Sequence, residues 1–346
     1  MVSRILTPSE EDALVRFDDA GKGPHVESLF LKVNLSDARA LWLKVTFLRR
    51  TFGAKESVIE AWAIAFNLSA PGADPHVALK QSWAPSEAEI APNCLYIRVG
   101  DVELAHGRAT GTLTDGVTGD TIGWDLAYTC EPEGFHHLPY PWMYEGSVPK
   151  SKANSPQIDS RFTGTVSVNG KKTAIEDAPG MLGHNWGSQH AEDWTWAHCN
   201  RWTGIEGVVF EGVTSKVKMG PMTTPRLTVL HVRIPGERIT MNGIRQLVGS
   251  KSRPEGLRWA FAGQRGDRRI QGWFSAPAER FVGVDYHDPD GQIAHCLNTK
   301  IADGELAVYG RGANGWEQLL AATCDRSAAL EIGSREDTHG VPIRIR

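Results

Sequence analysis

The chain has 346 residues, of which 41% are hydrophobic and 23% charged, and its formal net charge is −4. This composition excludes an intrinsically disordered chain, and the length suits two domains of ordinary size better than one small core. Acidic and basic residues are interspersed, so the sequence has neither the basic surface of a nucleic-acid-binding protein nor a polybasic membrane-binding segment.

No segment has the features of a targeting or membrane-spanning sequence. Residues 1–12 lack the apolar core of a secretory signal, and no stretch approaches the roughly 20 apolar residues that cross a bilayer. The five cysteines are scattered and form no Cys-x-x-Cys pair, which argues against a disulfide framework and a zinc ribbon. We therefore expect a cytoplasmic protein.

Alternation of apolar and polar residues predicts strands along the whole chain. The predicted strands cover residues 31–35, 41–47, 60–68, 76–83, 94–99, 107–113, 122–129, 163–175 (as a hairpin), 194–202, 208–217, 227–234, 257–261, 270–275, 281–286, 294–299, 305–309 and 319–325. One helix is expected over residues 9–17, with Ser9 as its N-cap.

Turn signals separate these strands. Asn169-Gly170 predicts a type I′ hairpin turn, and further turns are expected at residues 235–236, 289–291 and 303–304. Residues 140–156 are rich in Pro, Ser and Lys and break the strand pattern, which predicts a long loop over residues 131–157. His136-His137 is expected to serve the packing of that loop.

Many short strands with almost no helix predict an all-β protein of the barrel or sandwich type. About 16 strands are more than one small barrel holds, so we expect two consecutive β-barrel or β-sandwich domains. The first would span residues 1–190, including the long loop, and the second residues 191–346.

Tryptophan is unusually frequent, with twelve residues against six Tyr and eleven Phe. Because an indole combines a large apolar face with one N–H donor, this surplus favours a cavity for a large apolar ligand. The other interpretation, that the indoles fill β-barrel cores, stays open.

The most distinctive segment runs from Gly183 to Trp202. It opens with Gly-His-Asn-Trp-Gly at residues 183–187, where the glycines allow sharp turns and the close approach of other segments of the chain. In the following predicted strand the even-numbered side chains share one face. That face carries Trp194, Trp196, His198, Asn200 and Trp202. We interpret it as the wall of a cavity that touches an apolar molecule at one or two polar points.

The next predicted strand carries Glu211. In a hairpin with the Trp-rich strand, Glu211 would lie close to His198 and to the cavity. Apolar surroundings raise the pKa of a carboxyl group, because desolvation disfavours its charged form, and a neutral carboxyl can donate a proton. Two other interpretations stay open, Glu211 as a solvent-facing residue and His184 as a structural histidine.

The motif at residues 183–187, followed by Trp194-x-Trp196, resembles the signature of the bacterial carotenoid 1,2-hydratase (hydroxyneurosporene synthase) family. The same superfamily includes tocopherol-cyclase-like proteins and the lipocalin-like Diels–Alderases of fungi. The resemblance is specific over residues 149–212, and its first part is similar to a mostly uncharacterised bacterial branch. It implies two consecutive lipocalin-like β domains with few helices.

The resemblance also implies site residues. In the hydratases the matching His and Trp, with a Tyr and an acidic residue downstream, act in protonating an isolated alkene. Here the sequence departs from that pattern, because the corresponding downstream segment, residues 209–213, has no Tyr-x-Asp and offers Glu211 as its only acid. We assign the catalytic roles to His184, Trp186 and Glu211. The residues assigned to substrate binding are Asn185, Trp194, Trp196, His198, Asn200, Trp202 and Phe210.

A site of this kind would start its reaction with an acid. Neutral Glu211 or protonated His184 would protonate an alkene, the cation would rest against Trp186 or Trp196, and water or an internal hydroxyl would capture it. No cofactor is expected, because no Walker loop is found. No metal is expected either, because the nearby histidines match no zinc spacing.

We therefore expect the chain to bind a large apolar molecule, isoprenoid-like or polyene-like, and to hydrate or cyclise it. Two alternatives stay open, a non-catalytic carrier of the lipocalin type and a pocket that only pre-orients a polyene. The expected partner is the apolar ligand, without nucleic acid and without an integral membrane segment. Transient contact with a membrane would allow the protein to collect that ligand.

Overall fold

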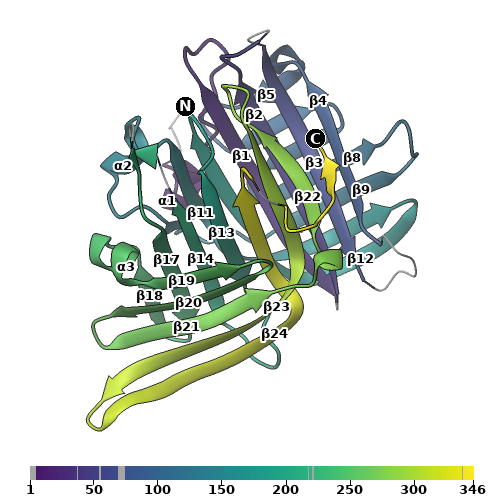
Figure 1. The fold of residues 1–346 in the computed structure, drawn as a ribbon. Helices are drawn as coiled ribbons and strands as arrows, with labels where there is room; N and C mark the ends of the chain where they lie inside the picture. Colours follow the sequence, from purple (N-terminus) through teal and green to yellow (C-terminus); the bar gives the residue numbers. More distant parts are fainter. Residues whose placement is uncertain are drawn as a thin grey trace.

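The computed structural model of the protein describes residues 5–36, 38–53, 56–68, 75–216, 218–219, 222–336 and 338–346. Over these residues the chain forms two large, barrel-like and almost entirely antiparallel sheets (Figure 1). The first has twelve strands and the second eleven. The predicted all-β, lipocalin-like fold with few helices is confirmed.

The first sheet has the order β4-β3-β2-β1-β12-β11-β9-β8-β7-β6-β5, and β10 pairs with β11. Its strands are β1 (His25–Ser36), β2 (Arg39–Arg49), β3 (Ser57–Asn67), β4 (Val77–Trp83), β5 (Ala88–Ile90), β6 (Tyr96–Val99), β7 (Val102–Ala105), β8 (Arg108–Thr114), β9 (Thr121–Tyr128), β10 (Phe135–His136), β11 (Ser151–Val168) and β12 (Lys171–Gly187).

The second sheet has the order β18-β17-β14-β13-β24-β23-β21-β20-β19, with β22 beside β23 and β25 beside β22. Its strands are β13 (Asp193–Cys199), β14 (Val209–Lys216), β17 (Leu227–Ile234), β18 (Glu237–Met241), β19 (Lys251–Glu255), β20 (Arg258–Arg265), β21 (Arg268–Ser275), β22 (Val282–His287), β23 (Ile293–Gly312), β24 (Gly315–Ser334) and β25 (Ile343–Ile345). A separate small ladder joins β15 (Lys218–Met219) and β16 (Met222–Thr223).

The chain passes from the first sheet to the second between Gly187 and Asp193. A division into domains at residues 190 and 191 stays a prediction. Each sheet has its own apolar core, and a third cluster joins the two sheets. That cluster packs Trp42 and Trp62 of the first sheet against Val284 and Tyr286 of the second. Contact of this kind holds the facing surfaces of the two sheets in a fixed arrangement.

The helices are short. They are α1 (Pro8–Asp12), α2 (Trp142–Glu145) and α3 (Ile244–Gly249), with 3₁₀ turns η1 (Pro85–Glu87) and η2 (Ala278–Arg280). The prediction of Ser9 as N-cap is wrong, because Thr7 caps α1 in a capping box with Glu10. The Ser9 hydroxyl instead donates to the carbonyl of Pro156. None of the helices in the described ranges is long and apolar enough to span a membrane.

The structure confirms some predicted turns and corrects others. Asn169 and Gly170 both have positive φ, 49° and 78°, as a type I′ turn requires. Asp303-Gly304, in contrast, lies inside β23, where the ring of Phe274 packs so closely that it excludes a side chain at Gly304. Glycine therefore marks close packing there rather than a turn.

The predicted loop over residues 131–157 contains regular structure. It includes β10, α2 and the beginning of β11. Pairing of β11 with β12 shifts register between Asn154 and Gln157, so Pro156, which has no N–H to donate, lies in an irregular part of the strand. The Trp-rich strand β13 is shorter than predicted and ends at Cys199. Val217, the last residue of another predicted strand, lies outside the described residues.

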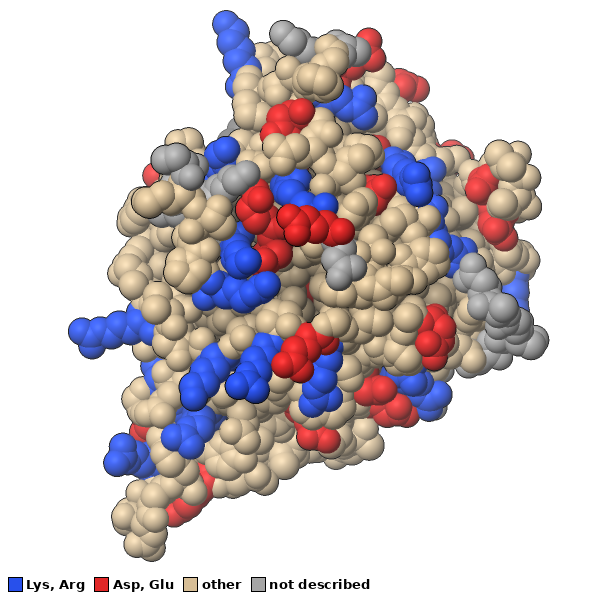
Figure 2. Space-filling model, in the orientation of Figure 1, with Lys and Arg blue, Asp and Glu red and all other residues tan. Residues whose placement is uncertain are grey.

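One face of the molecule shows how its charges are arranged. On the face shown in Figure 2, basic and acidic side chains lie interspersed, as the sequence predicts. All five cysteines, each within the described ranges, are free thiols.

The last glycine of the 183–187 motif has a backbone that only glycine tolerates well. Gly187 has a φ of 155°, and an added Cβ would collide with the carbonyl oxygen of Lys150. We expect Gly187→Ala to lower the free energy of unfolding by about 2–4 kcal/mol, measured by urea denaturation. Gly116→Ala is the control, because its Cβ would meet no atom within 4 Å. Equal stability of the two variants would contradict this account of the motif.

Candidate functional site

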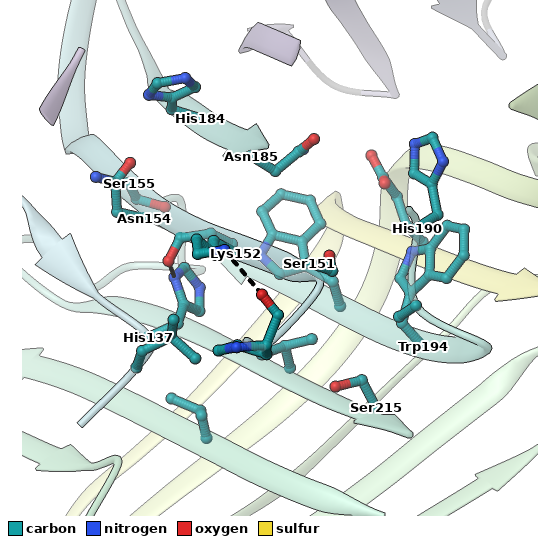
Figure 3. A pocket seen from close by; sticks show the side chains of 18 of the residues that line it. His137, Ser151, Lys152, Asn154, Ser155, His184, Asn185, His190, Trp194 and Ser215 are labelled. Carbon is teal, nitrogen blue, oxygen red and sulfur yellow. Dashed lines mark hydrogen bonds between the residues drawn. The ribbon is translucent and has the colours of Figure 1, made fainter. Parts of the chain in front are cut away.

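A cavity of about 220 Å³ lies between the two sheets. Its wall combines strands of the first sheet, the segment before β11 and strands of the second sheet. The apolar part of the wall includes Phe30, Trp42, Leu138, Pro139, Met143, Trp194, Trp196, Val213, Leu227, Val229 and Leu247. In the view of Figure 3, His137 and Ser155 lie at one side of the cavity and His190 and Trp194 at the other.

The structure brings five of the predicted site residues to this wall. They are His184, Asn185, Trp194, Trp196 and Glu211. Trp194 and Trp196 project from the same face of β13, as the alternation predicts, and the ring of Phe30 meets Trp196 edge to face at 5.7 Å.

His198 and Asn200 do not line the cavity, but lie in a buried polar cluster beside it. His198 donates from Nε2 to the Ile158 carbonyl at 2.8 Å, and its Nδ1 accepts from Lys32 Nζ at 3.3 Å. Burial lowers the pKa of the His198 imidazole to about 3, so this ring is neutral. Asn200 binds the same lysine and the carbonyl of Gly180. These side chains hold the two sheets together.

Trp202 and Phe210 belong to the core of the second sheet. Trp202 follows the end of β13, so the alternation no longer governs its direction. Phe210 is next to Glu211 on β14 and therefore points to the opposite face. Both rings pack against Phe274, at centroid distances of 6.2 and 5.1 Å.

Glu211 lies on the cavity wall and is fully buried. Strands β13 and β14 pair with His198 opposite Glu211, so the predicted hairpin is confirmed and the solvent-facing interpretation is wrong. Oε1 of Glu211 accepts three hydrogen bonds, from His137 Nε2 (3.1 Å), Ser155 Oγ (2.7 Å) and Trp196 Nε1 (3.0 Å). Oε2 has no hydrogen-bond partner among the described residues.

The expectation that Glu211 has a raised pKa is wrong. Burial alone would raise the pKa of this carboxyl, but the charge and the hydrogen bond of His137 outweigh burial and lower it to about 2. His137 Nδ1 faces the carbonyl of Ala153 at 3.1 Å, so it donates there. With Glu211 ionised, Nε2 donates as well. The Glu211 carboxyl is therefore ionised, and His137 faces it as a hydrogen-bond donor.

His137 is a cavity-lining residue that sequence reasoning missed. Its expected role in loop packing is incomplete, because the ring lies on the cavity wall. The neighbouring His136 does serve local structure, through its hydrogen bond to Asp12 at 2.7 Å. No sequence signal joins His137 to Glu211, since the two residues are 74 positions apart.

His184 belongs to a second buried pair. Its Nδ1 donates to the carbonyl of Asp12 at 2.7 Å and its Nε2 to Oε1 of Glu27 at 2.8 Å. Burial alone would raise the pKa of Glu27, but hydrogen bonds from His184 and His25 outweigh it and lower that pKa to about 2. Both nitrogens of His184 are thus engaged with protein acceptors, which favours the structural interpretation of this histidine.

Trp186 packs behind His184, with ring centroids 4.7 Å apart, and is not among the cavity-lining residues. The guanidinium of Arg16 covers its ring at 4.1 Å. Of the two indoles predicted to stabilise a cation, only Trp196 faces the cavity.

Another group of polar residues lines the cavity near Trp194. The rings of His190 and Tyr286 stack at 5.3 Å, and those of Trp194 and Tyr286 at 6.3 Å. Lys44 and Glu331 lie in the same part of the wall. Across the described ranges, no three His, Cys, Asp or Glu side chains are placed to hold a metal ion.

The fold and the site define a class of β protein in which two large sheets enclose an aromatic cavity with a buried acid–base pair. A model of the tocopherol cyclase-like family matches residues 157–334, which is 178 of the 346 residues. The chain belongs to the tocopherol cyclase-like family. The matched region includes the 183–187 motif, β13 and β14.

The chain is also similar to individual proteins. Uncharacterised proteins of Mycobacterium tuberculosis, strains H37Rv and CDC 1551, are 23% identical over 235 residues, 67% of this chain and 67% of each relative. The structure of CghA with Sch210972 superposes with a TM-score of 0.53 at 11% identity, covering 95% of this chain and 97% of that chain. Kievitone hydratase from Nectria haematococca gives 0.52 at 10% identity, covering 96% and 93%. At these identities the structural comparisons establish the fold.

Proposed function

We propose that this protein binds a large apolar small molecule in the cavity and catalyses a cofactor-independent hydration or cyclisation at one of its double bonds. The observation that carries this proposal is the Glu211 carboxylate, which is fully buried and has one oxygen, Oε2, without a partner in the described structure. Family membership and the name of kievitone hydratase, a protein of the same fold, support a reaction of this class.

An unsatisfied carboxylate oxygen is costly in an apolar cavity. Leaving a buried acceptor without a donor costs about 1–3 kcal/mol, and more when the group is charged. A hydrocarbon would leave this cost in place. A water molecule or a ligand hydroxyl that donates to Oε2 removes it, and the carboxylate then holds the group that attacks a cation.

The pair of His137 and Glu211 accounts for both proton transfers. In this proposal the pair shares one proton. When that proton is on the carboxyl group of Glu211, it can add to a double bond of the ligand. The resulting cation lies against Trp196, whose ring stabilises it by roughly 1–2 kcal/mol. Water or a hydroxyl then forms the new C–O bond and returns its proton to the Glu211 carboxylate, so the pair is restored and no cofactor is consumed.

His184 and Trp186 have a supporting role in this proposal. Their ring contact and the hydrogen bonds of His184 fix the end of β12, which carries Asn185 at the cavity wall. Direct participation of His184 or Trp186 in catalysis stays a prediction, as do cytoplasmic location and transient contact with a membrane.

Deuterium incorporation tests the proposal. The apolar molecule that co-purifies with the protein is extracted, identified by mass spectrometry and incubated with the protein in D₂O. We expect hydration to add the mass of one D₂O molecule and cyclisation to exchange one hydrogen for deuterium, in both cases with deuterium on carbon. Ligand returned with unchanged mass would contradict the reaction and favour the alternative, a non-catalytic carrier of the lipocalin type.

A further inference from the structure

Lys44 lies in the cavity wall without an anionic partner. Its side chain projects from β2 and is 5% exposed. Nζ lies 3.6 Å from the ring centroid of Tyr286 and 5.7 Å from those of Trp42 and Trp62. No acceptor in the described part of the chain forms a hydrogen bond or ion pair with Nζ; the carboxylates of Glu331 and Glu60 act on it only through their charge.

The charged groups around Lys44 are paired with one another. Lys300 Nζ donates to Asn298 Oδ1 and to Glu331 Oε1, both at 2.6 Å. Lys80 forms an ion pair of 3.0 Å with Glu60 on the far side of the Trp62 ring. The thiol of Cys296 and the hydroxyl of Tyr286 carry no charge, because burial raises the pKa of each well above its ordinary value. Lys44 therefore supplies one uncompensated positive charge.

A buried ammonium without a partner is costly. Burial lowers the pKa of Lys44 to about 8, although the charge of Glu331 opposes this change, so the group still holds its proton at neutral pH. Contact with aromatic faces offsets only part of the lost hydration. Buried charges in proteins are normally paired, and here Lys44 and the Tyr286 ring that its Nζ contacts both line the cavity.

We infer that Lys44 receives a carboxylate of the ligand, so that the substrate class is an apolar carboxylic acid rather than a hydrocarbon or an alcohol. This inference rests on the proposed function of the cavity. A head group with one negative charge matches the single ammonium of Lys44. A phosphate or diphosphate would bring two or more negative charges to this ammonium, near the Glu331 carboxylate.

The position of Lys44 also separates the head group from the reacting bond. Tyr286 stacks on His190 and Trp194, which lie at the side of the cavity opposite His137 and Ser155 (Figure 3). A ligand whose carboxylate meets Lys44 would extend its apolar chain past Trp194 and Trp196 towards Glu211. The double bond that reacts would then be remote from the acid group.

Fluorescence titration with cis-parinaric acid and its methyl ester tests this inference, because the two probes share one polyene chain and differ by the methyl group that removes the charge of the head group. We expect the acid to bind about tenfold to a hundredfold more tightly than the ester, as a charge-assisted hydrogen bond predicts. Lys44→Met should abolish this preference and leave binding of the ester unchanged. In the parent protein the preference should begin to fall as the pH rises through the pKa of Lys44 in the free protein, about 8.

Two matched variants serve as controls. Lys80→Met removes a lysine next to the same Trp62 ring but outside the cavity, and it should keep the preference. Lys152→Met removes another cavity-lining lysine, whose Nζ already donates to the carbonyl of Pro149 (2.8 Å). Loss of the preference in Lys152→Met but not in Lys44→Met would place the anion elsewhere and overturn the inference.

The remaining outcomes separate this inference from the proposed function. Equal binding of acid and ester by the parent protein would overturn the inference and leave an apolar-ligand site intact. Failure of both probes to bind would count against both. Thermal unfolding should show Lys44→Met at least as stable as the parent, since the change removes an unpaired buried charge.

Discussion

Replacing Glu211 by glutamine is expected to lower the rate of product formation by about 10²–10⁴-fold, the range typical of a lost acid–base group. Glutamine keeps the shape of the side chain, and its carbonyl oxygen can still accept from His137, Ser155 and Trp196. It cannot receive or deliver a proton at the position of Oε2. Affinity for a ligand that makes only apolar contacts at this point should therefore stay within about threefold of the parent value. Single-turnover rates and a separate binding titration measure the two effects.

Two further variants make the Glu211 result interpretable. Glu305→Gln removes an exposed carboxylate of β23 and should change neither rate nor affinity. Glu211→Asp keeps the acid but withdraws it from the cavity by one methylene, so partial activity is expected. A Glu211→Gln variant as active as the parent would rule out the acid–base role of Glu211.

Much of the fold follows from local periodicity. The surroundings of Glu211 show which features periodicity predicts and which it does not. Alternation predicted β13 and β14, and their pairing brings Glu211 opposite His198. The charge state of Glu211 depends on His137, which approaches from a segment 74 residues earlier. Periodicity records which side chains share a face of one strand. It carries no information about which distant segment covers that face.

Lys44 illustrates a second limit of prediction from the sequence. In a strand with one solvent-exposed face, a lysine between two apolar residues is expected in water. In β2, however, all residues between the first and the last are buried, because one face meets the core and the other meets the second sheet and the cavity. The polar alternation is therefore present in the sequence, but the burial of the polar face depends on how the two sheets pack.

Within the nine residues from Trp194 to Trp202, alternation predicted the direction of two indoles correctly and of one wrongly. Trp194 and Trp196 lie within β13 and reach the cavity as their spacing predicts. The strand ends at Cys199, so Trp202 turns into the core of the second sheet instead. An element boundary, which local patterns define poorly, decided which indoles form the wall.

The largest effect on stability is expected from His184→Ala. This change removes one partner of a fully buried ion pair and leaves the carboxylate of Glu27 with less compensation. Breaking such a pair costs about 3–5 kcal/mol, a large share of the 5–15 kcal/mol that stabilises an ordinary domain. Urea denaturation at pH 7 measures the loss. His136→Ala is the control, because His136 pairs with Asp12 while 52% exposed and should cost less than about 1 kcal/mol.

The pH dependence of the stability lost in His184→Ala distinguishes a structural role of His184 from a catalytic one. Glu27 has a pKa of about 2 in the folded protein against an ordinary value of 4.5, so the unfolded chain binds more protons as the pH falls between these values. The stability that this carboxylate contributes is fully present above pH 4.5 and is lost as the pH falls towards 2, by about 3 kcal/mol in all. Because His184 is a main cause of the low pKa, the stability difference between the parent and His184→Ala should narrow over the same pH range. A variant that kept full stability at pH 7 and lost only product formation would instead support His184 as the catalytic acid.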